Sequence, residues 1–151
     1  MKKSLLLSLL AISALAFSCK KDEPVVAADK IYQVSTTLSG ANEVPAVTTS
    51  ATGTTTGTYN QTTKILTVSS TFTGITPTGG HIHTQAVPTN ATKSGGVTFN
   101  FGTTLNSPVV YTTTTPLTAE QEANLLNGIM YVNFHTPANP GGEIRGNLMA
   151  K

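Results

Sequence analysis

Near the C-terminus, residues 128–148 read Gly-Ile-Met-Tyr-Val-Asn-Phe-His-Thr-Pro-Ala-Asn-Pro-Gly-Gly-Glu-Ile-Arg-Gly-Asn-Leu. Apolar and polar side chains alternate at the start, with Met130, Val132 and Phe134 on one face of a β-strand and Tyr131, Asn133 and His135 on the other. The Pro/Asn/Gly run that follows predicts a turn into a second strand. We therefore expect a two-stranded unit that packs through one face and presents a histidine from the other.

The other two histidines of the chain, His81 and His83, lie two residues apart in Gly-Gly-His-Ile-His-Thr. On a strand both would point to the side opposite Ile82. Imidazole is a good ligand for copper and zinc, and two such rings on one strand face can hold a single ion. A copper or zinc site at His81, His83 and His135 is therefore expected if the fold brings the three together. Structural roles, with the rings bonded to strand carbonyls, and contact with a partner stay open beside it.

Several polar residues accompany the histidines in these segments. Tyr131 and Asn133 share the face of His135, where they would support the ligands or simply cover the sheet. Glu143 and Arg145 occupy alternate positions of Gly-Glu-Ile-Arg-Gly, which favours an ion pair or a contact with a histidine over catalysis. Glu43 is one of few acidic residues, suited to anchoring a loop or to binding a metal.

The composition restricts the class of protein. The chain has 151 residues, 38% of them hydrophobic, enough for one domain, and only 11% are charged. The polar surface must then come largely from Thr, Ser and Asn, which favour strands and turns. Without Lys2 and Lys3, seven of the nine basic residues remain against seven acidic ones, so no basic patch indicates a nucleic-acid partner. No nucleophile elbow, phosphate loop, catalytic carboxylate pair or nucleotide fingerprint is present, so an ordinary hydrolase or kinase is not supported.

Short β-rich runs separated by turn residues recur along the chain. We expect strands over residues 31–38, 51–59, 64–72, 97–101 and 109–115, besides those that carry the histidines. The one helix expected spans residues 117–128, where Thr118 and Gln121 make a capping box and Gly128 ends it. The pattern predicts an all-β fold, a Greek-key-like β-sandwich or flattened barrel with one short helix.

The N-terminus resembles a bacterial lipoprotein leader. Residues 1–18 read as a signal peptide, and the only cysteine, Cys19, follows the apolar run as in a lipobox. We expect Cys19 to carry lipid and residues 19–30 to tether a β domain of residues 31–151 to the outer membrane, on its periplasmic or outer surface. Lys20-Lys-Asp-Glu23 resembles the export tag of some surface lipoproteins, or is a solvated tether. Ordinary cleavage would instead leave a free thiol, and no intramolecular disulfide can form.

Three motifs in order resemble the CHRD (chordin-type) domain family. They are Leu38-Ser-Gly-Ala-Asn-Glu-Val-Pro-Ala-Val47, Gly80-His-Ile-His83, and Gly128-Ile-Met-Tyr-Val-Asn-Phe-His-Thr136 with Pro140-Gly-Gly-Glu-Ile-Arg-Gly146. The family is extracellular and has no generally assigned activity. The resemblance therefore implies a non-enzymatic binding module with an envelope or extracellular protein as partner.

The His-x-His pattern also looks like part of the copper site of Cu/Zn superoxide dismutases. Only His81 and His83 match two copper ligands; His135 has no secure counterpart, and the bridging histidine, zinc carboxylate and disulfide have none. Two further functions thus stay open beside the binding module. One is a redox-active copper protein, and the other is a purely structural, adhesin-like surface domain.

Overall fold

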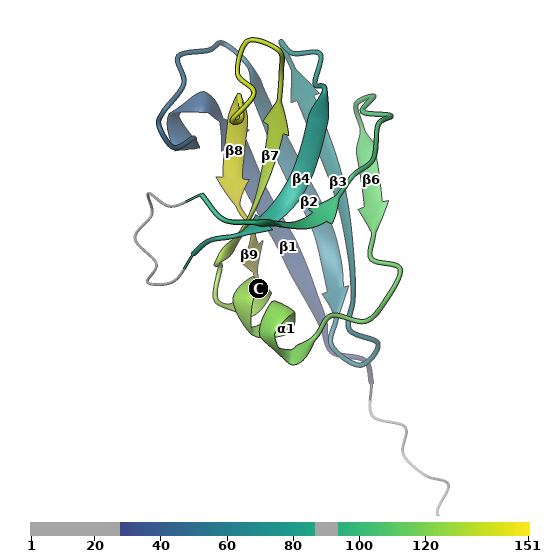
Figure 1. The fold of residues 1–151 in the computed structure, drawn as a ribbon. Helices are drawn as coiled ribbons and strands as arrows, with labels where there is room; N and C mark the ends of the chain where they lie inside the picture. Colours follow the sequence, from purple (N-terminus) through teal and green to yellow (C-terminus); the bar gives the residue numbers. More distant parts are fainter. Residues whose placement is uncertain (1–27, 87–93) are drawn as a thin grey trace, which may run out of the picture.

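The computed structural model describes residues 28–86 and 94–151. Its elements are β1 (Ile31–Ser39), the 3₁₀ turn η1 (Gly40–Asn42), β2 (Thr52–Asn60), β3 (Ile65–Thr73), β4 (Gly79–Thr84), β5 (Val97–Asn100), β6 (Val109–Thr112), α1 (Ala119–Leu126), β7 (Met130–His135), β8 (Ile144–Asn147) and β9 (Met149–Ala150). The predicted all-β fold with one short helix is confirmed (Figure 1). The predicted signal peptide and Cys19 lie outside the described residues.

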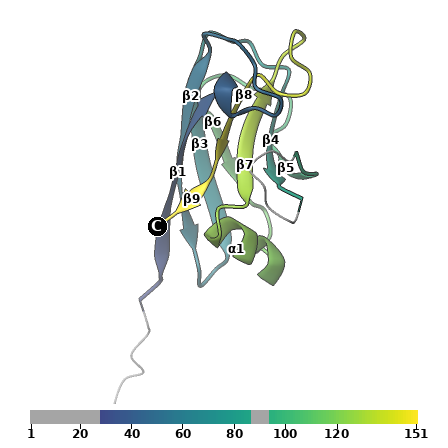
Figure 2. The same cartoon turned by 90° about the vertical axis from the view of Figure 1, so that its left-hand side faces the viewer.

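One antiparallel sheet forms the whole scaffold, in the strand order β5-β4-β7-β8-β1-β2-β3-β6, with β9 added beside β1. It curls between β8 and β1, where Ser39 and Arg145 are the only residues of these two strands that pair. The curl makes a half-barrel, in which β1, β2 and β3 form one wall and β4, β7 and β8 the other (Figure 2). No helix within the described residues is long and apolar enough to span a bilayer.

The β1-β2-β3 wall is a meander of nine-residue strands. Its inward face carries mostly apolar residues, with the hydrogen-bonded hydroxyls of Thr55 and Ser70 buried among them. Its outward face carries exposed hydroxyls, such as those of Thr54 and Thr71, which lie 2.9 Å apart across β2 and β3. Gly57 faces inward on β2, where a Cβ would overlap the carbonyl oxygen of Thr67. The low charge of the sequence is thus explained by a surface built from threonine and serine.

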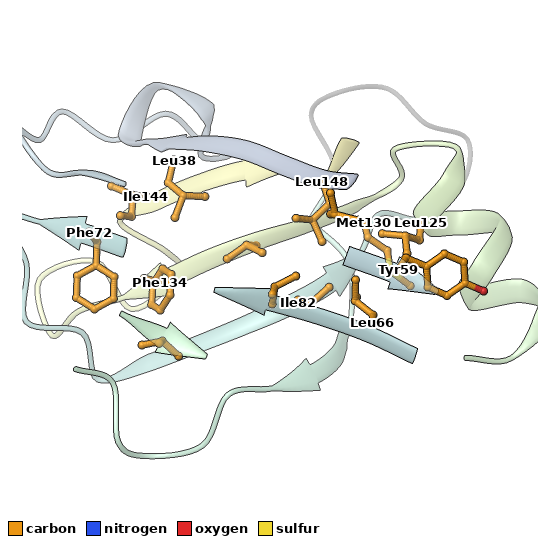
Figure 3. Packing of buried hydrophobic residues seen from close by; sticks show 14 of the residues in the cluster. Leu38, Tyr59, Leu66, Phe72, Ile82, Leu125, Met130, Phe134, Ile144 and Leu148 are labelled. Atoms are coloured by element: carbon orange, nitrogen blue, oxygen red, sulfur yellow. The ribbon is translucent and has the colours of Figure 1, made fainter. Parts of the chain in front are cut away.

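Buried apolar side chains fill the space between the two walls (Figure 3). Ile82, Val132 and Phe134 of the β4-β7 wall are fully buried there, facing Leu66 and Val68 of β3. Burying a side chain of this size contributes roughly 1.5–3 kcal/mol. Since Ile82 and Phe134 point into this core, the neighbouring side chains on β4 and β7 must point away from it.

The helix closes one end of the half-barrel (Figure 1). The predicted capping box is present: the Gln121 amide donates to Thr118 Oγ1, and the Thr118 amide donates to Gln121 Oε1. Leu125 is fully buried and lies near Tyr59 and Met130 (Figure 3). After the helix, Gly128 adopts a φ of 68°, which favours glycine, and the chain turns directly into β7.

Candidate metal site

The three histidines of the chain meet on one face of the sheet. Strands β4 and β7 are antiparallel neighbours, and their register pairs His81 with Asn133 and His83 with Tyr131. Because alternate residues share a face, His135 projects from the same side as both. One ring nitrogen from each histidine lies within 4.8 Å of the other two. The convergence that the sequence left open is therefore present in the fold.

Main-chain carbonyls fix the protonation of two of the rings. His83 Nδ1 lies 2.9 Å from the Gly95 carbonyl oxygen, and His135 Nδ1 lies 3.0 Å from the Pro140 carbonyl oxygen. A carbonyl oxygen only accepts, so in both rings Nδ1 carries the hydrogen and donates it. Both Nε2 atoms are then unprotonated and each carries a lone pair, which is the form of imidazole that binds a metal.

The third ring contacts the second directly. His81 Nδ1 lies 2.9 Å from His135 Nε2. Because the Nε2 lone pair of His135 is the acceptor, His81 donates from Nδ1 in this arrangement. Binding an ion through His81 Nδ1 requires only that the proton of this ring move to its Nε2. The donor set available to an ion is thus Nδ1 of His81 and Nε2 of His83 and His135.

Burial keeps the cluster neutral. It is the largest cause that lowers the pKa of each of the three imidazoles below the ordinary value of 6.5. For His81, the neighbouring charges of His135 and His83 lower the pKa further. His83 is buried, and its Nε2 has no hydrogen-bond partner among the described residues. His81 and His135 are part-exposed, so an ion held here would keep one side open to solvent.

A glycine leaves room where the rings of β4 and β7 approach each other. Gly79 lies directly opposite His135 in the register. A Cβ on Gly79 would lie 3.4 Å from His81 Cε1 and 3.5 Å from His135 Cδ2, in contact with both rings. Its partner Gly80 faces the core, where a Cβ would lie 2.7 Å from the Phe134 ring. The Gly-Gly pair thus allows close approach of side chains on both faces of β4.

Tyr131 and Arg145 extend the site into the sheet. The Tyr131 ring is stacked on His83, with centroids 4.9 Å apart and planes 5° from parallel. The Arg145 guanidinium lies 3.4 Å from the Tyr131 centroid, a cation–π contact. Since β4 and β8 flank β7 on opposite sides, Tyr131 lies between the histidine and the arginine. Arg145 is only 2% exposed, so its charge is fixed within this stack.

The acidic residues near the site contact groups other than the three histidines. Glu143 accepts hydrogen bonds from Thr49 Oγ1, at 2.8 Å, and from Thr136 Oγ1, which hold its pKa below the ordinary value. Within residues 28–86 and 94–151, no ion pair joins Glu143 to Arg145. Burial instead raises the pKa of Glu43 to about 7. The positive charge of Arg145 and hydrogen bonds, including one with Asn133, act in the opposite direction and lower this pKa. Glu43 therefore belongs to a buried polar group with Asn133 and Arg145.

Two main-chain groups that belong to the site were not predicted from the sequence. The carbonyl oxygens of Gly95 and Pro140 orient His83 and His135, and a backbone carbonyl has no residue type that marks it. The residue type at position 95 does indicate a close contact, because only glycine fits there. A Cβ on Gly95 would overlap the carbonyl oxygen of Thr84. A Gly-Gly pair in a long polar connection therefore indicated a close approach of two strands.

Comparisons with known proteins identify a family and no close relative. The family model described as CHRD domain matches residues 34–148, which include most of β1, all of β2 to β8 and all three histidines. No curated protein and no solved structure matches the chain.

Proposed function

The chain belongs to the CHRD domain family, and from its histidine cluster we propose that it is a metal-binding module of the cell envelope that holds one copper or zinc ion. The ligands are His81 Nδ1, His83 Nε2 and His135 Nε2. The observation that carries this proposal is the approach of three neutral imidazole nitrogens to within 4.8 Å of one another. Carbonyl oxygens on the far nitrogens of two rings are the support that metal-binding histidines usually have.

The three imidazole ligands restrict which metal ions can bind. Three imidazoles without a carboxylate or thiolate suit copper and zinc better than calcium or magnesium, which prefer oxygen ligands. The part-exposed rings of His81 and His135 leave a coordination position for water or a small molecule.

Calorimetric titration of the domain with Cu²⁺ and Zn²⁺ tests this proposal. We expect one ion per chain, and loss of binding in His81→Ala, His83→Ala and His135→Ala. Gln33→Ala, on an exposed side chain of β1, is the matched control and should bind as the wild type does. Circular dichroism of each variant separates lost ligands from lost folding. Negligible heat with the wild-type domain for both metals would remove the metal site.

A second function, redox chemistry at copper, is favoured by the open side of the cluster. Bound Cu²⁺ would take one electron from an external reductant and return it to a small oxidant that reaches the open position. The electron paramagnetic resonance signal of bound Cu²⁺ should then disappear with ascorbate and return in air. A signal that never returns would leave a binding module without redox turnover.

The tether is the second part of the proposed function. Its support is the leader of residues 1–18 followed by Cys19 and a short charged segment. The lipid would hold the domain on the envelope, where it meets the metal and any envelope or extracellular protein partner. Metabolic labelling with radioactive palmitate in a bacterial host should mark the full-length chain and not Cys19→Ser. Label that persists in Cys19→Ser would contradict lipidation at this residue.

A further inference from the structure

Gly95 makes two hydrogen bonds at once, and both lead to the histidine cluster. Its amide donates to Tyr131 Oη at 3.1 Å, and its carbonyl oxygen accepts from His83 Nδ1 at 2.9 Å. Tyr131 and His83 are directly opposite each other on β7 and β4, and their rings are stacked. One peptide segment therefore holds both partners of a stacked pair.

The backbone around Gly95 is adapted to this position. The register of β4 and β5 shifts between Ile82 and His83, which brings the chain before β5 over the histidine. The Thr84 amide donates to the Gly96 carbonyl oxygen at 3.2 Å, so the segment stays attached to β4. Only glycine fits at residue 95, because a Cβ would overlap the carbonyl oxygen of Thr84.

Tyr131 has little freedom to leave this arrangement. It is 2% exposed, with His83 on one ring face and the Arg145 guanidinium 3.4 Å from the ring centroid. Its hydroxyl is therefore held where it accepts the Gly95 amide hydrogen. The position of the Gly95 carbonyl, and with it the orientation of the His83 ring, follows from the position of this hydroxyl.

From this geometry we infer that Tyr131 is a positioning residue that acts through the peptide groups of Gly95 to orient His83, and that metal occupancy is coupled to residues 94–96. The inference rests on the proposed function. Coordination at Nε2 makes the Nδ1–H of the same ring a stronger donor, which tightens its bond to the Gly95 carbonyl. By reciprocity, forming this hydrogen bond strengthens metal binding by the same factor by which metal binding favours the bond.

Tyr131→Phe tests the positioning role, because it removes the hydroxyl and keeps the stacked ring. We expect a loss of Zn²⁺ affinity of about tenfold, the lower end of the usual effect of changing a ligand's support. We also expect a changed copper hyperfine splitting, which reports the ligand geometry directly. Tyr111→Phe is the matched control, since Tyr111 packs against Phe99 and Phe101 away from the histidines and should leave both readouts unchanged.

Hydrogen exchange of the Gly95 amide in the wild-type domain tests the coupling without any variant. Zn²⁺ should slow this exchange, whereas the Thr54 amide in the β1-β2-β3 wall should change less. If the wild-type domain binds no metal, the proposed function itself fails. If it binds metal, but Tyr131→Phe keeps the wild-type affinity and Zn²⁺ leaves the Gly95 exchange unchanged, only the coupling is refuted.

Discussion

Glu43 and Arg145 are charged side chains buried beside the histidine cluster, and each alters the other. Arg145 is almost inaccessible, and desolvation lowers the pKa of its guanidinium, with the Tyr131 ring and Glu43 opposing this effect. Glu43 Oε1 is buried without a hydrogen-bond partner among the described residues. A Cβ on Gly142, which has a φ of 134°, would overlap this oxygen, so glycine is needed there. A buried, incompletely satisfied carboxylate is costly once it ionises.

Replacing Glu43 with Gln should change how stability depends on pH. Burial raises the pKa of Glu43 from 4.5 to about 7 in the folded domain. Between these values the folded state keeps a proton that the unfolded chain releases, so stability falls as pH rises, and the loss is complete above pH 7. The shift corresponds to roughly 3–4 kcal/mol. Urea unfolding from pH 4.5 to 8 should show Glu43→Gln gaining this much relative to the wild type.

The histidine contributions cancel in that comparison, because both variants keep all three rings. A stability difference between Glu43→Gln and the wild type that stays constant over the same pH range would show that Glu43 ionises in the fold as it does in the unfolded chain.

The pH dependence of metal binding follows from the histidines themselves. An imidazole binds metal only when neutral, and burial lowers the pKa of all three rings below 6.5. As pH falls, affinity for Zn²⁺ should therefore begin to decline at a lower pH than it would for imidazoles of ordinary pKa. Competition with a chelator of known affinity, measured in steps from pH 7.5 to 5, checks this. A break in the affinity curve at or above pH 6.5 would mean that the rings are protonated more easily than their burial implies.

At the scale of elements, strand β4 carries the site on one face and core residues on the other. Ile82, which lies between the two histidines of β4 in the sequence, is fully buried. Gly79 and Gly80 precede the histidines and pair with His135 and Phe134 of β7. The position of β4 depends on what packs under Gly80. A substitution on the core face of β4 should therefore change the stability of the domain.

Gly80→Ala should destabilise the domain by about 1–3 kcal/mol, the usual cost of overpacking a core. Its Cβ would lie 2.7 Å from the Phe134 ring and 3.1 Å from the Phe101 ring, both rigid groups. Gly96→Ala is the control, because nothing lies within 4 Å of a Cβ there. Urea unfolding of both variants measures the difference. Equal stabilities would show that the Phe134 ring moves aside without cost.

For the molecule as a whole, the metal would join strands that belong to one wall of the half-barrel. The ligands come from β4 and β7, and β7 leads through β8 to the curl that connects this wall to β1. Such an ion binds the folded state and finds no preformed site in the unfolded chain. Metal binding should therefore appear as stability of the entire domain.

Thermal unfolding with and without Zn²⁺ measures this effect. At a free Zn²⁺ concentration of about 100 times Kd, the stabilisation should be about 2.7 kcal/mol. His135→Ala should show no stabilisation, because one of three ligands is missing. A wild-type domain that binds Zn²⁺ but unfolds at an unchanged temperature would indicate that the unfolded chain binds the metal equally well.

The elements of this protein follow largely from local patterns. The capping box of Thr118 and Gln121 and the strands over β2, β3 and β7 were all predicted and are present. The second face of β7 is not exposed as the alternation suggested, because Tyr131 and Asn133 are each only 2% exposed. Capping, alternation and β-branching act between residues close in sequence, so a single chain displays them. The same patterns, with the absence of an enzyme motif, restricted the histidines to ligand or structural roles.

Whether the three rings meet was decided only by the tertiary structure. His81 and His135 lie far apart in the sequence, and their contact depends on β4 pairing with β7, which no local pattern specifies. The tautomers of His83 and His135 depend on carbonyl oxygens of Gly95 and Pro140, and the pKa of Glu43 depends on burial beside Arg145. Strand pairing, desolvation and backbone hydrogen bonds are properties of the closed fold, because each needs groups that folding alone brings together.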